Sequence, residues 1–315
     1  MRFLVAGIGA IGSAFGGMLR KAGNEVWLLG RSNQVSVIKQ QGLRISGLWG
    51  DHLVKGFHYL NLPIHCSETF DVILVTVKSY DTATLIRQLR SVIGEHTLLV
   101  SLQNGLGNLE TIREMGRTAF VVGGRVIFGA MLPTVGEVRI TVYTQPVMLG
   151  FPDMTTRHYS ASFIERAQKT VHSINAAGIP CQFTNTIESF MWAKLLYNCA
   201  LNPLSALHGV PYGVLAEKPE WKEIMEGVIR EIFAVARKRQ IPLTWDTPEA
   251  FLDLFYSKLL PDTYEHRSSM LQDIERGKQT EIDNLNGMVV RYGEEMKVAT
   301  PINRELTHAI KMLKR

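Results

Sequence analysis

The chain has 315 residues, of which 46% are hydrophobic and 20% are charged. This composition is typical of a globular protein with one large or two ordinary domains. Lys and Arg outnumber Asp and Glu by 34 to 29, which gives a formal net charge of +5. The basic residues are spread along the chain and form no run, so they favour an anionic small molecule as a partner and argue against nucleic acid.

The three cysteines, Cys66, Cys181 and Cys199, are too few and too scattered for a disulfide framework. A reducing cytoplasm is therefore the expected location. The sequence contains no CxxC motif and no Cys/His cluster, so we expect no metal site.

The first 19 residues resemble a signal peptide, because an early arginine precedes a long apolar run. The alternative is a buried strand, a glycine-rich turn and a helix, and the frequent glycines of this stretch favour it. No other apolar run is long enough to span a bilayer, so we expect no membrane partner.

The beginning of the chain has the pattern of a dinucleotide-binding unit. A strand over residues 2–7, a helix over 13–23 and a second strand over 24–31 surround the sequence GIGAIG. In a G-x-G-x-x-G turn the first glycine makes the bend, the second lets the backbone approach a pyrophosphate, and the third lets helix and strand pack closely. The predicted cofactor-binding residues of this turn are Gly7, Ile8, Gly9, Ala10, Ile11 and Gly12.

The end of the second strand indicates which dinucleotide is bound. An NAD site usually has an acid there for the ribose 2′-hydroxyl, but this chain has Gly30 and Arg31. A guanidinium suits a 2′-phosphate, so the pattern favours NADP(H). The alternative is that Arg31 is an ordinary exposed arginine.

Strands and helices continue to alternate up to about residue 135. Strands are predicted over 71–79, 97–105 and 119–132, and helices over 80–93 and 107–116. Such alternation predicts an α/β domain with a parallel sheet, whose ligands bind beyond the carboxyl ends of the strands. Lys78 and Asn104 fall at such ends, so both are candidate ligand-binding residues, although each could be a plain loop residue.

The remaining pattern predicts an all-helical second domain. Residues 136–150 resemble a hairpin or a sheet edge, 162–178 a helix, and 179–185 a last strand. We therefore place the domains at 1–185 and 186–315. The helices of the second domain are predicted over 186–201, 220–240, 247–259, 263–276, 280–296 and 302–314.

The predicted helix over 186–201 carries a polar line. Lys194 and Asn198 are four residues apart, and Asn202 follows after four more, so the three lie roughly along one face of an apolar helix. Burying an unpaired ammonium is costly, so Lys194 either reaches water or serves a site. The amides could bind the lysine, a substrate or a cofactor ribose. Since Asn202 precedes Pro203, we expect the helix to end nearby.

A second polar cluster lies in residues 267–287. Ser269 and Glu281 are twelve residues apart, with Gly277 between them. An acid near a helix start is often a cap, so capping and catalysis both remain open for Glu281.

The sequence resembles the ketopantoate reductase (2-dehydropantoate 2-reductase) family over nearly its whole length. The shared motifs are GIGAIG, VTVKSYD, SLQNGLGN, WAKLLYNCALNPLSAL and SSMLQDIERGKQTEIDNLNG. The resemblance implies a Rossmann domain that binds NADP(H), a helical domain, and reduction of 2-dehydropantoate to pantoate in pantothenate biosynthesis.

The resemblance also implies roles for single residues. Lys194 and Glu281 would be catalytic, and Lys78 and Arg31 would help to hold the cofactor. The residues that would line the substrate and nicotinamide pocket are Asn104, Asn198, Asn202, Ser269 and Glu281. A hydroxylated 2-oxo acid is the expected partner, and a homodimer is one oligomeric state open to the chain.

Two alternatives remain. One is a related reductase of another small 2-oxo acid or imine, because the fold does not fix the substrate. The other is a non-catalytic sensor of NADP, which would not need Lys194, Asn198 and Glu281 together.

Overall fold

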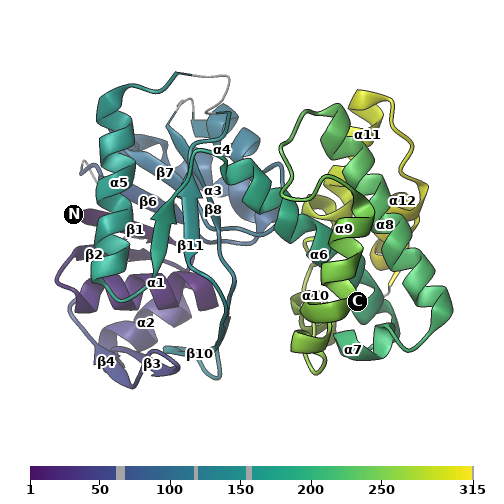
Figure 1. Ribbon diagram of the computed structural model, residues 1–315. Coiled ribbons are helices and arrows are strands. Elements are labelled where there is room, and N and C mark those ends of the chain that lie inside the picture. Colours follow the sequence, from purple (N-terminus) through teal and green to yellow (C-terminus); the bar gives the residue numbers. More distant parts are fainter. Residues whose placement is uncertain (62–67, 117–119, 154–157, 314–315) are drawn as a thin grey trace. The chain divides into compact units, whose positions relative to one another are not determined.

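The computed structural model describes residues 1–61, 68–116, 120–153 and 158–313. The chain divides into two compact units. The first comprises Met1–Gln103 and Asn108–Ile187, and the second comprises Asn104–Gly107 and Glu188–Arg315 (Figure 1). The four residues that follow Gln103 thus group with the second unit, although they follow a strand of the first.

The first unit is built on an eight-stranded sheet in the order β12-β11-β8-β7-β6-β1-β2-β5. All neighbouring strands are parallel except β11 and β8. The predicted α/β domain with a parallel sheet is therefore confirmed, with one antiparallel pair added. The strands are β1 (Arg2–Ala6), β2 (Glu25–Leu29), β5 (His58–Tyr59), β6 (Val72–Val75), β7 (Leu98–Ser101), β8 (Val121–Arg125), β11 (Val147–Gly150) and β12 (Cys181–Phe183).

Helices cover both faces of this sheet. They are α1 (Ala10–Lys21), α2 (Ser32–Gln41), α3 (Thr82–Leu89), α4 (Asn108–Gly116) and α5 (Ala161–Ala176). The chain runs from β1 to β2 in one direction and from β6 through β7 to β8 in the other. Right-handed crossovers then place α1 opposite α3 and α4, and α3 indeed packs on α4 while α1 packs on α5. The strand order reverses between β1 and β6, which is where ligands bind in such sheets.

A second, four-stranded sheet of order β4-β3-β10-β9 packs against α1. Its strands are β3 (Leu43–Gly47), β4 (His52–Val54), β9 (Phe128–Met131) and β10 (Glu137–Tyr143). The single strand predicted over 119–132 is wrong, because β8 lies in the large sheet and β9 in the small one. The predicted hairpin over 136–150 is also divided, since β10 pairs with β9 and β11 pairs with β8.

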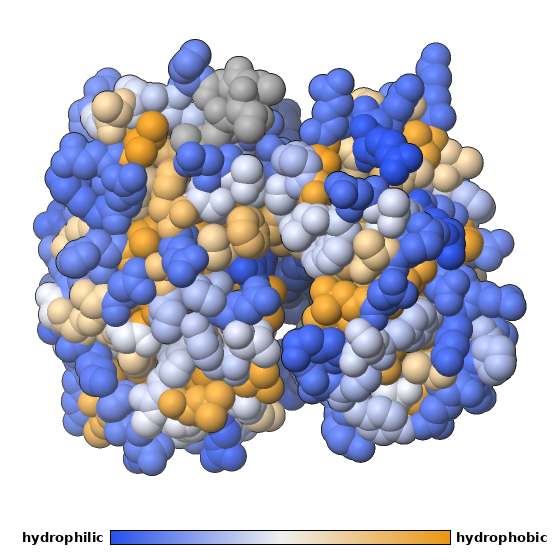
Figure 2. Space-filling view, viewed as in Figure 1, coloured by the Kyte–Doolittle hydropathy of each residue, from blue (hydrophilic) through white to orange (hydrophobic). Residues whose placement is uncertain are grey.

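The face shown in Figure 2 is mostly hydrophilic, with separate apolar patches. Most of the exposed large apolar side chains belong to the small sheet and its turns: Leu48, Leu53, Met131, Val135, Val142 and Tyr143. No helix of the described residues is long and apolar enough to cross a membrane.

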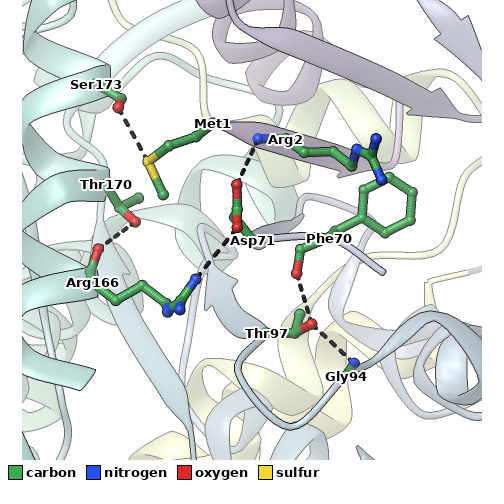
Figure 3. A network of polar contacts seen from close by, with 9 residues as sticks. All are labelled: Met1, Arg2, Phe70, Asp71, Gly94, Thr97, Arg166, Thr170 and Ser173. Carbon is green, nitrogen blue, oxygen red and sulfur yellow. Dashed lines mark hydrogen bonds and ion pairs between the residues drawn. The ribbon is translucent and has the colours of Figure 1, made fainter. Parts of the chain in front are cut away.

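Polar contacts tie together the amino-terminal ends of the central strands (Figure 3). Asp71 accepts a hydrogen bond from the backbone N–H of Arg2 at 2.8 Å and pairs with Arg166 of α5 at 3.4 Å. The buried Thr97 hydroxyl donates to the carbonyl of Phe70 at 2.7 Å. These contacts join β1, β6, β7 and α5, so the edge of the sheet away from the ligand side is firmly held.

The second unit is helical and has its own apolar core, which confirms the predicted all-α region after the Rossmann domain. Its α-helices are α6 (Ile187–His208), α7 (Tyr212–Leu215), α8 (Pro219–Lys238), α9 (Pro248–Leu254), α10 (Ser269–Glu275), α11 (Asn286–Met296) and α12 (Pro301–Met312). Two predicted starts are wrong. The helix predicted from residue 263 begins at Ser269, and the one predicted from 280 is a short 3-10 turn over Ile282–Asn284 followed by α11.

The predicted end of the polar helix is also wrong. Helix α6 continues through Pro203 to His208. A proline has no N–H for the carbonyl four residues earlier, here that of Cys199. The side chain of Asn286 supplies the missing donor at 3.1 Å, so the break in the ladder is satisfied from another helix.

Cys181 and Cys199 are free and buried, and Cys66 lies outside the described residues. Burial raises the pKa of the Cys181 thiol to about 12 and that of Cys199 well above its ordinary value. Both stay protonated at neutral pH, which leaves them poor nucleophiles.

Candidate functional site

The glycine turn after β1 is held by three hydrogen bonds from different elements. Gly7 donates its N–H to the carbonyl of Leu29, the last residue of β2, at 2.9 Å. Thr76, which follows β6, donates its hydroxyl to the Gly7 carbonyl at 2.7 Å. Gln34 of α2 donates Nε2 to the Ile8 carbonyl at 2.9 Å. The turn therefore has a fixed shape at the point where the strand order reverses.

The space around each of the three glycines of the turn differs. Gly7 has φ +119°, a conformation that side chains rarely adopt, and a Cβ there would lie 2.7 Å from the nitrogen of Val77. A Cβ on Gly12 would lie 1.9 Å from the Gly7 carbonyl oxygen. A Cβ on Gly9 would meet nothing closer than 4.0 Å. Packing thus explains why residues 7 and 12 are glycines, whereas the space beside the Gly9 backbone is open.

The beginning of α1 is suited to an anion. Gly9 is the N-cap residue, no side chain caps the helix, and its first turn contains no acid. The first N–H groups and the positive end of the helix dipole therefore face the turn without a competing carboxylate. The residues predicted to bind a pyrophosphate, Gly7 to Gly12, lie together as the sequence analysis expected.

Arg31 lies two residues beyond β2 and is the N-cap residue of α2. Its side chain is exposed. A Cβ on Gly30 would lie 2.5 Å from the side chain of Ile8, so this glycine lets the turn pack on the end of β2. Together with the Gln34 contact, this packing places the start of α2 beside the glycine turn. Arg31 would need this position to bind a ribose phosphate.

Lys78 lies three residues past the end of β6, where the strand predicted over 71–79 has already ended. A buried amide holds this segment. Gln103 donates Nε2 to the carbonyl of Val77 at 2.9 Å and to the hydroxyl of Thr82 at 2.7 Å, and its Oε1 accepts from Ser101 at 3.1 Å. The loops after β6 and β7 are thereby joined at the ligand side of the sheet.

In the second unit, Lys194 Nζ donates a hydrogen bond to Asn104 Oδ1 at 2.6 Å. Lys194 is half-buried on α6, and its neighbours Trp192, Leu195 and Leu196 are buried. The ammonium therefore lies on an apolar helix with an amide oxygen as a partner. Two candidates that lie 90 residues apart in the sequence are thus in direct contact.

The segment Asn104–Gly107 is attached to the region that contains Glu281. Leu106 and Asn284 exchange two hydrogen bonds, of 2.8 and 3.0 Å. A Cβ on Gly105 would lie 2.2 Å from the Asn284 carbonyl, so only glycine permits this approach. Glu281 is 8% exposed and is the N-cap residue of the 3-10 turn Ile282–Asn284. Hydrogen bonds thus connect Lys194 to Asn104, and the segment that follows Asn104 to the turn that Glu281 precedes.

The other candidates of this unit differ in exposure. Asn198 is half-buried on α6, one turn beyond Lys194. Asn202 is 4% exposed, and its Oδ1 accepts a hydrogen bond from the Tyr212 hydroxyl. Burial raises the pKa of Tyr212, so this hydroxyl keeps its proton as a donor. Ser269 is exposed at the start of α10, next to the buried N-cap residue Ser268.

Three residues that hold the ligand side of the first unit were not predicted. Thr76, Gln34 and Gln103 all bind backbone carbonyls through their side chains. Thr76 and Gln103 each lie one or two residues before a candidate, Lys78 or Asn104. A polar residue at the end of a buried strand is the signal that would have indicated Thr76 and Gln103, whereas Gln34 lies in α2 and has no such signal.

Comparison with known proteins agrees with this arrangement. The family model described as "Ketopantoate reductase PanE/ApbA" matches residues 3–153, and "Ketopantoate reductase PanE/ApbA C terminal" matches residues 186–314. The chain belongs to the ketopantoate reductase family.

Curated relatives cover almost the entire chain. The 2-dehydropantoate 2-reductase of Aquifex aeolicus is 38% identical over 99% of this chain and 96% of its own. That of Pyrococcus abyssi is 35% identical over 99% and 97%. A ketopantoate reductase family structure from Ralstonia eutropha is 30% identical with a TM-score of 0.86, covering 99% of this chain and 98% of its own.

A second kind of solved structure is also similar. A ternary complex of D-mandelate dehydrogenase with NADH and anilino(oxo)acetate is 25% identical, with a TM-score of 0.86 over 99% of this chain and 97% of its own. Among the described residues, no group of three His, Cys, Asp or Glu side chains could hold a metal ion.

The glycine geometry predicts different outcomes for two alanine substitutions in this ketopantoate reductase family member. Gly12→Ala forces the Gly7 carbonyl to move and should destabilise the first unit by about 1–3 kcal/mol. Gly9→Ala should change the free energy of unfolding by less than about 1 kcal/mol. Because its methyl group fills the open space beside the backbone, it should nevertheless weaken NADPH binding at least about tenfold.

Urea denaturation and titration of NADPH fluorescence would measure these effects. Gly23→Ala provides a control: it should destabilise the first unit, because Gly23 has φ +86°, but it lies in open space away from the turn and should leave NADPH affinity unchanged. Unchanged NADPH affinity in a folded Gly9→Ala protein would contradict the assignment of the space beside Gly9 to the pyrophosphate.

Proposed function

We propose that the chain catalyses the NADPH-dependent reduction of 2-dehydropantoate to pantoate. The observation that carries this proposal is the ammonium of Lys194, bound to Asn104 on an apolar helix of a ketopantoate reductase family member. Family membership over both units and curated relatives of the same length support it further.

A nicotinamide dinucleotide is the cofactor that the first unit fits. The glycine turn and the uncapped start of α1 would hold the pyrophosphate, and Lys78 would add a cation at the same edge of the sheet. Residues 26–35 contain no acid, and Arg31 follows β2 where a 2′-phosphate requires a cation. These features support NADP(H) over NAD(H). When bound, the cofactor supplies the hydride.

Lys194 performs the proton chemistry of the proposed reaction. As a hydride is added to C2 of the 2-oxo acid, negative charge develops on the carbonyl oxygen. The Lys194 ammonium stabilises this charge and donates the proton that completes the hydroxyl group, leaving a neutral amine that water reprotonates. Asn104 fixes the direction of Nζ, because its Oδ1 accepts one of the three ammonium hydrogens.

Glu281 would select the hydroxylated substrate. A buried carboxylate that accepts a hydrogen bond from the substrate hydroxyl favours that substrate over analogues without the group, since their complexes lack this hydrogen bond. The 8% exposure of Glu281 fits this role. Asn198 and Ser269 are the further candidate substrate residues. Asn202 would act through its buried bond with Tyr212, which supports α6 behind Lys194.

The likeness to D-mandelate dehydrogenase favours one second candidate. That protein is solved with NADH and a bulky 2-oxo compound, so an NADH-dependent reductase of a larger 2-oxo acid is the alternative for this fold. Arg31 and Glu281 favour the first candidate over it, because Arg31 suits a 2′-phosphate and Glu281 suits a substrate hydroxyl.

The cofactor assignment predicts the effect of Arg31→Ala. Removing a charged hydrogen bond of about 1.5–3 kcal/mol should raise the KM for NADPH about ten- to a hundredfold, whereas the KM for NADH should change little. Steady-state kinetics with both cofactors measures this difference. Arg44→Ala, which alters another arginine of the first unit, serves as the control. Equal increases in the KM for NADPH and for NADH would show that Arg31 does not bind the 2′-phosphate.

The mechanism predicts the effect of Lys194→Met, which keeps the volume of the stem and removes the charge. Turnover should fall by about a hundred- to ten-thousandfold, the usual loss for a general acid. NADPH affinity should persist, because the first unit supplies the cofactor-binding groups.

Lys222→Met, a change at an exposed lysine of α8, is the matched control and should keep full turnover. Near-normal turnover of Lys194→Met would refute its role as the proton donor.

A further inference from the structure

Helix α6 contains a proline in its interior, and the consequence falls on a single carbonyl. Pro203 has no N–H to donate to the carbonyl of Cys199, four residues earlier. Cys199 is fully buried, so water cannot take the place of that donor. A buried carbonyl without a donor is strongly disfavoured, and a partner from outside the helix is required.

Asn286, the first residue of α11, is that partner. Its side chain is fully buried, and Nδ2 donates to the Cys199 carbonyl at 3.1 Å and to Asn303 Oδ1 at 3.0 Å. Both neighbours are oxygen acceptors, so the amide nitrogen must face them. The two hydrogens of the amide are thereby both used.

The chain of hydrogen bonds continues to a carboxylate. Asn303 is also fully buried and donates its Nδ2 to Glu231 of α8 at 2.7 Å. Glu231 in turn accepts the backbone N–H groups of Ile302 and Asn303, at 2.8 and 3.0 Å, at the start of α12. Glu231, Asn303 and Asn286 therefore form a buried polar chain that joins α8, α12 and α11 to one point of α6.

That point lies on the buried side of α6, next in the chain to its polar residues. Cys199 directly follows Asn198 and is five residues from Lys194. Where a proline interrupts the ladder of a helix, the direction of the preceding turns depends on local partners. Asn286, on another helix, donates to the interrupted carbonyl.

We propose that Asn286 is a positioning residue for the reaction. By replacing the donor that Pro203 lacks, it sets the direction of the α6 turns that carry Lys194 and Asn198. It does not touch the substrate. This inference rests on the proposed role of Lys194, and it assigns a catalytic consequence to a residue inside the helical core.

The proline itself provides the test. In Pro203→Ala the backbone gains an N–H that can bond the Cys199 carbonyl, and the second lone pair of that oxygen still accepts from Asn286. The experiment therefore compares Asn286→Leu in the natural background with the same change in the Pro203→Ala background. Asn286→Asp, of almost equal size, turns an oxygen towards both acceptors and serves as a second variant.

In the natural background, Asn286→Leu should lower the Tm by about 3–10 °C. It should lower kcat at least about tenfold with the KM for NADPH unchanged, since a small displacement of a catalytic group costs rate. In the Pro203→Ala background the same change should cost less than about threefold in kcat. Pro203→Ala alone should retain turnover.

A readout without substrate keeps this test separate from the proposed function. The rate at which acetic anhydride modifies Lys194 can be followed by mass spectrometry. This rate depends on the position and accessibility of the Lys194 side-chain nitrogen. Asn286→Leu should change this rate severalfold, and adding Pro203→Ala should restore it. If the wild type fails to reduce 2-dehydropantoate, the proposed function fails, while the labelling rates still decide the inference.

Equal losses of kcat in both backgrounds would overturn the inference, and so would an unchanged Lys194 labelling rate in a folded Asn286→Leu protein. If both substitutions at position 286 lower the Tm but leave kcat and labelling unchanged, Asn286 is purely structural and the inference is wrong.

Discussion

A lysine ammonium on an apolar helix needs an acceptor, and the arrangement of the helical unit follows from this constraint. Lys194 lies among buried aromatic and aliphatic side chains and finds the Asn104 oxygen at 2.6 Å. Asn104 can lie there because Gly105 permits close contact with the Asn284 carbonyl. Asn284 ends the turn whose N-cap residue is Glu281, so the same packing joins the segment of Asn104 to the segment that carries Glu281.

In the first unit, close packing imposes a comparable constraint on the glycine turn, where the strand order reverses. The carbonyl of Gly7 is held by Thr76 and approached so closely by Gly12 that no side chain fits there. The bonds of Gln34 and Gln103 fix the loops on either side. A turn held from several elements presents its N–H groups without rearrangement, which lowers the cost of binding an anion. Gly9 is the position at which this rigid frame remains open to a ligand.

The sequence predicted the features that depend on local pattern. The glycine turn, the strands and helices around it, and the polar line on α6 all follow from spacing within a few residues. Distant partners decided the rest. The small sheet was missed because β3 pairs with β10, some ninety residues later in the chain. The continuation of α6 past Pro203 was missed because its missing donor comes from Asn286.

Single site residues show the same division. Asn104 was predicted from its place after a strand, but its bond to Lys194 spans 90 residues and no local pattern encodes it. Lys78 was placed at a strand end, whereas β6 ends three residues earlier. Whether Ser269 and Asn198 bind the substrate stays a prediction, because their surroundings in the helical unit allow that role without requiring it.

The proposed reaction is the reduction of a hydroxylated 2-oxo acid with NADPH. The most direct measurement is NADPH oxidation by the purified protein with 2-dehydropantoate, 2-oxoisovalerate and phenylglyoxylate in parallel. 2-Dehydropantoate carries the hydroxyl group that Glu281 would bind, and 2-oxoisovalerate lacks it. Phenylglyoxylate has an aromatic ring in place of the branched chain. We expect the kcat/KM for 2-dehydropantoate to be at least about a hundredfold above the values for the other two acids. A preference for phenylglyoxylate, or equal values for the first two acids, would contradict it.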